Sequence, residues 1–123
     1  MATRIFLVRV TLAFALLAIW PCTSWAHAFP VESEPGAGDT VQGTPFYVRI
    51  RFDVELEPIF CTLRVRNNRG QTVSKGKGHV DSSDATLLLA HVPSVPPGIY
   101  HVYWKAASRD GHHTQGDYTF NVR

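Results

Sequence analysis

The stretch Phe46–Phe52, which reads FYVRIRF, decides the fold class because apolar residues alternate with polar or amphipathic ones along its whole length. A period of two places successive side chains on opposite faces of an extended chain. The pattern therefore predicts a β-strand with one buried and one exposed face. The predicted buried face consists of Phe46, Val48, Ile50 and Phe52.

The same alternation recurs later in the chain, and turn-forming residues separate the runs. Residues 67–70 and 93–98 are rich in asparagine, proline and glycine, which favour turns. About seven short strands with no helical period after residue 26 are typical of an all-β fold, an immunoglobulin-like Greek-key antiparallel β-sandwich. Tyr100 is predicted to form a tyrosine corner. The other predicted strands are residues 59–65, 71–74, 85–92, 99–107 and 118–122.

Residues 1–26 have the layout of a secretory signal, with a basic start, an apolar run over 10–20 and small residues after it. We therefore predict a cleaved signal peptide over 1–26 and one mature domain over 27–123. The apolar run is shorter than the roughly 20 residues that a membrane-spanning helix needs. Two cuts fit the small-residue rule, one before His27 and one before Phe29, and the rule alone slightly favours the second.

The predicted mature domain has balanced charge and a single cysteine. Residues 27–123 contain ten lysines and arginines and ten aspartates and glutamates, so phosphate neutralisation gives no support for nucleic-acid binding. Cys61 has no cysteine left to pair with inside the domain. We expect Cys61 to be a buried small hydrophobe, with binding of Cu(I) or pairing between chains as the alternatives.

The stretch 108–113, which reads SRDGHH, holds the first half of a candidate metal site. Asp110 and His112 stand two residues apart, so they share one side of an extended segment, and Gly111 between them permits unusual backbone angles. Asp-Gly is also a common hairpin turn pair, so a plain turn that carries a histidine is the alternative interpretation. His113 is expected to point to the opposite side, in a solvated or supporting role.

His27 supplies the second half of the candidate site if the signal is cut before it. An N-terminal histidine offers its amine and its imidazole to the same metal ion. With His112 and a carboxylate oxygen of Asp110, the donors form an N,N,N,O set, which favours Cu(II), with zinc and nickel as competitors. The metal must displace protons from these ligands, so affinity is predicted to fall on acidification. In sandwiches of this type the first strand can run parallel to the last, which would bring His27 beside residues 108–112.

Several segments together resemble the CopC copper-resistance family. They are the start His27-Ala28, Ser33-Glu34-Pro35 with Gly38-Asp39, the aromatic strand from Pro97 to Trp104, and Ser108 to His112 followed by Gly116-Asp117-Tyr118-Thr119-Phe120. The resemblance covers essentially all of residues 27–123. It favours the cut before His27.

The resemblance implies a periplasmic Cu(II) binder that acts in copper resistance and homeostasis as a carrier or buffer. His27 would give amine and imidazole nitrogens, and Asp110 and His112 would complete the site. The implied partner is an inner-membrane copper protein of the CopD type, and the expected mature protein is a monomer outside the membrane. Some family members carry a methionine-rich Cu(I) site, which we expect to be absent because Met1 is the only methionine.

Two other classes of function stay open at this point. A copper-dependent oxidase or monooxygenase also uses an N-terminal histidine chelate, although the carboxylate of Asp110 argues against it, so we expect no enzyme activity. An immunoglobulin-like adhesion module with an incidental histidine would bind no copper specifically. The outward arginines of residues 46–66 are interpreted as one solvated stripe, provided that their strands pair. These arginines are Arg49, Arg51, Arg64 and Arg66.

Overall fold

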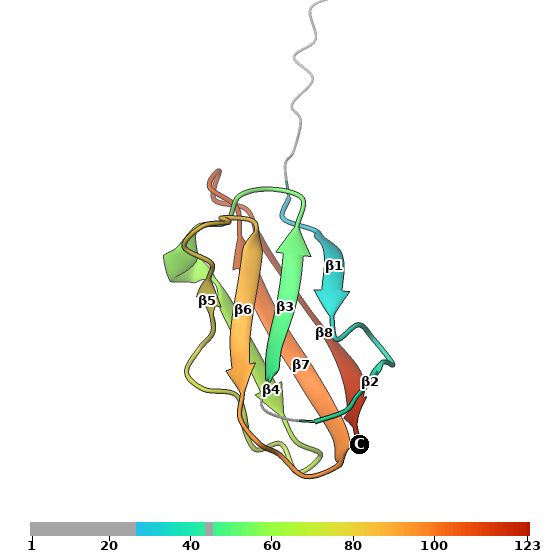
Figure 1. Cartoon of the computed structure of the whole chain (residues 1–123). Coiled ribbons are helices and arrows are strands. Elements are labelled where there is room, and N and C mark those ends of the chain that lie inside the picture. The colour runs from blue at the N-terminus through green and yellow to red at the C-terminus, as the bar shows by residue number, and fades with distance from the viewer. Residues whose placement is uncertain (1–26, 44–45) are drawn as a thin grey trace, which may run out of the picture.

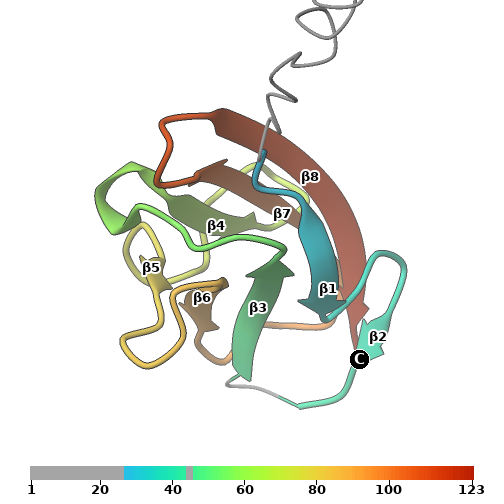
Figure 2. The same ribbon diagram turned by 90° about the horizontal axis from the view of Figure 1, so that it is seen from above.

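The computed structural model describes residues 27–43 and 46–123, so the predicted signal peptide lies outside the described residues. The chain forms two four-stranded sheets packed face to face, as Figures 1 and 2 show. One sheet has the order β1-β3-β6-β5 and the other β2-β8-β7-β4. The strands are β1 (Pro30–Glu34), β2 (Thr40–Val41), β3 (Phe46–Phe52), β4 (Thr62–Arg66), β5 (His79–Val80), β6 (Leu87–Val92), β7 (Gly98–Ala107) and β8 (His113–Val122).

The core lies between the sheets and follows the alternation of the sequence. Within β3, Val48, Ile50 and Phe52 are buried, whereas Phe46 is half-buried. The other sheet contributes its own alternate residues, including Trp104, whose ring meets that of Phe52 edge-on at 5.3 Å. The chain changes sheets after β1, β2, β3, β4 and β6. This confirms the predicted all-β, immunoglobulin-like sandwich, with eight strands where about seven were expected.

The tyrosine corner is confirmed, since the hydroxyl of Tyr100 donates a hydrogen bond to the carbonyl of Pro96 at 2.5 Å. Two local expectations are wrong. Ile59 is 69% exposed because Pro58 starts a short 3-10 helix, η2 (Pro58–Phe60), and β4 begins only at Thr62. Residues 71–74 form no named strand and contribute only a single bridge to β4.

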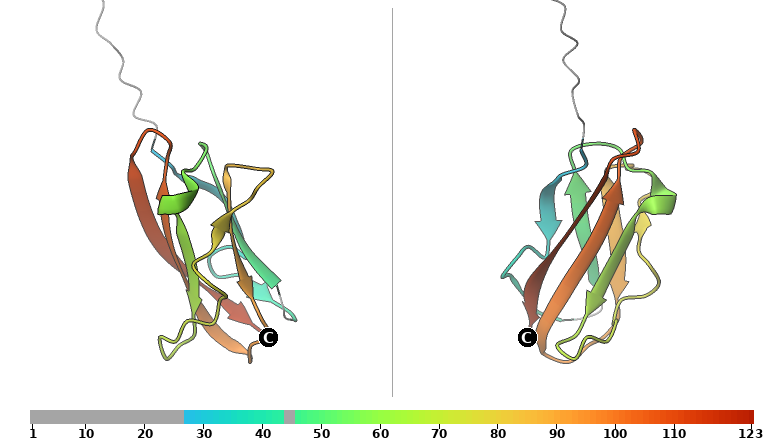
Figure 3. Two further views of the ribbon diagram at one scale, coloured as in Figure 1. Left: turned by 90° about the vertical axis from the view of Figure 1, so that its left-hand side faces the viewer. Right: turned by 180° about the vertical axis from the view of Figure 1, so that it is seen from behind.

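The pairing of the first strand also differs from the expectation. β1 pairs antiparallel with β3, and it is β2 that runs parallel to β8. The N-terminal residues of the described chain nevertheless lie at the same end of the sandwich as the β7–β8 loop, as both panels of Figure 3 show. Within the described part of the chain, no helix has the length and apolar character that crossing a membrane requires.

Candidate metal centre

The loop that carries Asp110 and His112 is a short, hydrogen-bonded connection between β7 and β8. Its ends are tied by the amide of Ser108, which donates to the carbonyl of His112 at 3.0 Å. The amide of Gly111 donates back to the carbonyl of Ser108 at 3.0 Å. Gly111 has a φ of 92°, a conformation that side chains with a Cβ disfavour. The predicted Asp-Gly turn therefore exists, and it presents both candidate ligands on one short loop.

Asp110 and His112 are in direct contact. Nδ1 of His112 lies 3.0 Å from Oδ1 of Asp110, and the backbone amide of His112 donates to the same oxygen at 3.2 Å. Two neighbouring donors bound to one ion at about 2.1 Å lie about 3 Å apart, so this spacing suits adjacent ligands as well as a hydrogen bond. The hydroxyl of Ser108 and the backbone amide of His112 both donate to Oδ1 of Asp110.

Ser108 is the residue that orients the carboxylate of Asp110. Its side chain is almost fully buried, and its hydroxyl donates a hydrogen bond to Oδ1 of Asp110. This bond is the largest cause that lowers the pKa of Asp110 to about 2, followed by the close contact with the imidazole of His112. The carboxylate is therefore ionised at any pH at which a histidine can bind a metal.

His27 is held beside His112 by contacts of the two residues that follow it. The hydroxyl of Thr114 on β8 donates to the carbonyl of Ala28 at 2.7 Å, and Ala28 is fully buried. The amide of Phe29 donates to Oδ1 of Asp53 at 2.9 Å. The imidazole centroids of His27 and His112 are 4.8 Å apart. Two imidazoles at neighbouring positions of one ion, each bound at about 2 Å, place their centroids at roughly this distance.

The structure thus brings the three predicted ligands together pairwise around His112. Within residues 27–43 and 46–123, no group of three His, Cys, Asp or Glu side chains is already arranged to hold a metal ion. In the full-length chain the backbone nitrogen of His27 is an amide, so the predicted amine donor would exist only if the chain were cut before His27. For all the predicted donors to reach one ion, side chains would have to rotate, and a cut before His27 would have to free its amine.

The other candidate residues lie outside this group. Cys61 is buried, its thiol donates to the carbonyl of Glu57 at 3.2 Å, and burial raises its pKa, which confirms the expected small buried side chain. His113 is exposed, with its ring 5.8 Å from that of Phe60. His91 on β6 makes an edge-on ring contact with Tyr47 on β3, in the sheet that does not carry the β7–β8 loop.

Sequence reasoning missed two residues of this end of the sandwich, Ser108 and Thr114. Ser108 lies within the predicted loop, and serine side chains often form local hydrogen bonds in turns, which is the signal that could have identified it. Thr114 carries no comparable signal, because its partner Ala28 is 86 residues away in the chain.

Comparison with known proteins gives consistent results. The CopC domain family matches residues 30–123. The copper transport protein CutJ of Bacillus subtilis is 30% identical over 107 residues, which is 86% of this chain but only 20% of CutJ. The chain therefore spans about a fifth of the length of that relative.

Two solved structures have the same fold. The crystal structure of CopC from Methylosinus trichosporium OB3b has a TM-score of 0.68 and 30% identity, covering 78% of this chain and 93% of that one. PcoC of Escherichia coli, described as a methionine-rich copper resistance protein, has a TM-score of 0.61 and 26% identity, covering 80% of this chain and all of PcoC. Because the family match takes in the sandwich from β1 onward together with the β7–β8 loop, this chain belongs to the CopC family.

Proposed function

We propose that this chain is exported to the periplasm, loses residues 1–26, and there binds Cu(II) as a carrier or buffer in copper resistance and homeostasis. In this proposal His27 provides its amine and imidazole, and Asp110 and His112 provide the remaining donors. The proposal assigns no enzyme chemistry to the chain.

The observation that carries the proposal is the convergence on His112 of two segments that are far apart in sequence. His27 contacts His112 ring to ring, and Asp110 lies 3.0 Å from Nδ1 of His112. A set of nitrogen donors with one carboxylate oxygen favours Cu(II), which also binds such sites more tightly than the other divalent metals of its row. The names of CutJ, a copper transport protein, and PcoC, a copper resistance protein, support the same metal.

We further propose that the bound copper is passed to an inner-membrane protein of the CopD type, with the carrier acting as a monomer. Support comes from CutJ, in which a segment related to this chain makes up only a fifth of a longer copper transport protein. In CutJ, a CopC-like segment and the rest of a copper transport protein therefore share one polypeptide. A separate carrier of the same family would need an equivalent partner.

The proposal depends on a free amine at His27, and one experiment tests it directly. The full-length chain is exported in a Gram-negative host, and the mature N-terminus is determined by mass spectrometry. Cu(II) affinity is then measured by competition with a chelator for three forms: the mature protein, a variant with one extra residue before His27, and a control with the same residue added after Arg123.

The N-terminal extension is expected to weaken binding by more than the about 10- to 100-fold loss typical of removing an outer partner of a metal ligand. The C-terminal control is expected to bind like the mature protein, because it leaves the amine unchanged. Equal affinity in all three forms, or a mature mass that starts at Phe29, would contradict the proposed chelate.

A further inference from the structure

The outer face of the sheet β4-β7-β8 gathers positive charge. Register pairs Arg64 of β4 with Tyr103 of β7, and Tyr103 in turn with Asp117 of β8, so these side chains form one row across the face. Lys105 lies in the next row, opposite Thr62. The right panel of Figure 3 views the sandwich from the side of this sheet.

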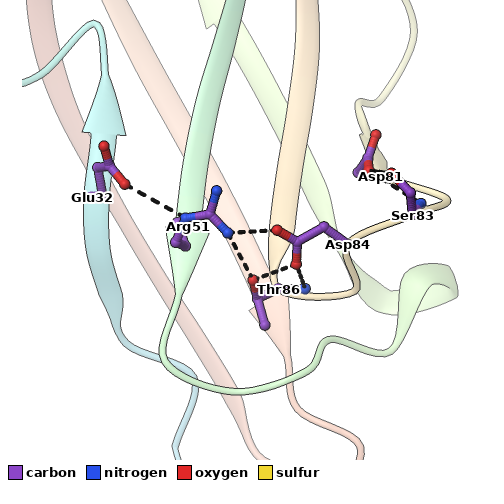
Figure 4. Close-up of polar contacts among 6 residues, drawn as sticks. All are labelled: Glu32, Arg51, Asp81, Ser83, Asp84 and Thr86. Atoms are coloured by element: carbon purple, nitrogen blue, oxygen red, sulfur yellow. Dashed lines mark hydrogen bonds and ion pairs between the residues drawn. The ribbon is translucent and has the colours of Figure 1, made fainter.

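The cationic side chains on the two sheets differ in whether they form ion pairs. On the sheet with β1 and β3, Arg51 contacts Glu32 at 3.5 Å and Asp84 at 2.5 Å, as Figure 4 shows. Arg49 is 4.0 Å from Glu34. Because β3 and β4 belong to different sheets, the single arginine stripe expected from the sequence does not form.

The cations of the β4-β7-β8 face are not neutralised in this way. Among the described residues, Arg64, Arg66 and Lys105 take part in none of the ion pairs. They line a hollow of about 370 Å³, and Asp117 is the only carboxylate among the residues that line it. The hollow therefore has an excess of positive charge, although residues 27–123 as a whole are balanced.

The hollow also contains the side chains that dominate protein–protein contacts. The guanidinium of Arg66 lies 5.1 Å from the centre of the Tyr103 ring, and Tyr103 is 41% exposed. Arginine and tyrosine are enriched among the residues that contribute most to binding energy. A ring that already stacks on one arginine presents an ordered surface rather than a set of independent mobile charges.

The edge of this sheet is covered, which restricts how a partner could bind. The amide of Leu63 donates to the carbonyl of Lys77 at 2.7 Å, and that of Val65 donates to the hydroxyl of Ser74 at 2.9 Å. A partner strand therefore cannot extend the sheet beyond β4 without displacing this loop. Binding has to take place on the face, through side chains.

We propose that the β4-β7-β8 face is a docking surface for an acidic segment of a partner protein, with Arg64, Arg66 and Lys105 opposite its carboxylates and Tyr103 in contact with its backbone. The charge excess selects an acidic occupant, and the Arg66–Tyr103 pair favours a polypeptide over a simple anion. The face runs along the sheet, whereas the candidate metal centre occupies the β7–β8 loop. The inference does not depend on copper, so its failure and that of the proposed function are distinguishable.

The test uses the mature protein without metal and a synthetic peptide rich in glutamate and aspartate with one tyrosine. Binding is measured by fluorescence anisotropy and by amide shifts in NMR spectra, at about 20 mM and about 150 mM salt, because exposed charges are screened at the higher ionic strength. The test variant is R64E/R66E. The matched control is R69E/K75E, which changes the net charge equally in loops outside the hollow, and K105E is a second, single test variant.

We expect the peptide to shift the amides of β4 and β7, and R64E/R66E to weaken binding at least about tenfold, since two attractions become repulsions. The control is expected to lose much less, and K105E to fall between the two. Equal losses in R64E/R66E and R69E/K75E would overturn the proposal. The proposal would also be overturned if the protein bound vesicles of anionic lipid but not the peptide, and if R64E/R66E abolished that vesicle binding. Such a result would assign the face to a membrane surface.

Discussion

Replacement of Thr114 by valine tests whether the sandwich itself holds His27 at the candidate metal centre. Valine has the shape of threonine but lacks the hydroxyl that donates to the carbonyl of Ala28 at 2.7 Å. Because Ala28 is fully buried, its carbonyl has no easy access to water once that donor is lost. We expect the free energy of unfolding to fall by about 1 to 2 kcal/mol.

The same bond sets an upper limit for the effect on metal binding. A loss of about 1 to 2 kcal/mol in holding the N-terminal segment corresponds to an increase of about five- to thirtyfold in its detached population. Apparent affinity falls in proportion to the fraction of molecules that are ready to bind. Thr114→Val is therefore expected to weaken Cu(II) binding by up to about thirtyfold, through position alone, which makes Thr114 a positioning residue rather than a ligand.

The assay combines chelator competition for Cu(II) with chemical denaturation of the metal-free protein. Thr114→Ser is the matched control, because serine keeps the hydroxyl and should retain both affinity and most of the stability. An unchanged affinity and stability in Thr114→Val would refute the reasoning. Equal losses in the valine and serine variants would also refute it, since they would trace the effect to packing rather than to the hydrogen bond.

Two further predictions concern the sandwich itself. Burial raises the pKa of Tyr118 to about 12, so the folded state keeps this phenol neutral while the unfolded state ionises it near pH 10. The contribution of Tyr118 to the free energy of unfolding is therefore fully present below about pH 10 and should be lost as the pH rises to about 12. In denaturation curves measured over this range, Tyr118→Phe should remove this part of the decline. Gly116→Ala should destabilise the fold by about 1 to 3 kcal/mol, because a Cβ there would lie 2.6 Å from Cζ2 of Trp104. A denaturation midpoint equal to that of the parent protein would show that the Trp104 ring moves aside without cost.

The sequence predicts this fold well wherever buried and exposed side chains alternate along a strand. The run Phe46–Phe52 becomes β3 because each apolar residue has a neighbour of opposite character on both sides. The same logic failed at Ile59, which was predicted to begin the next strand although it directly follows Pro58, whose ring fixes φ and starts a 3-10 turn. Pairing of β1 with β3 rather than β8 was also missed, since alternation identifies strands without identifying their partners.

The candidate site divides in the same way into local and non-local parts. The contact between Asp110 and His112 lies within one loop, so spacing alone was enough to anticipate it. The approach of His27 to His112 was anticipated from the family resemblance and from an assumed strand order that the structure does not have. The hydrogen bond from Thr114 to the carbonyl of Ala28 helps to hold His27 there instead. These two residues are too far apart in the chain for any sequence motif to reveal the bond.

That separation has a consequence for the order of folding. The hydrogen bond between Thr114 and Ala28 joins residues 86 positions apart, so it closes nearly the whole domain into one loop. Contacts of such long range form late, after the hairpins that bring their ends together. A copper ion bound to both His27 and His112 would select chains that have completed this last step, and it would raise their melting temperature as its concentration increases. Loading with the metal would then serve as a check that a copy of the domain has finished folding.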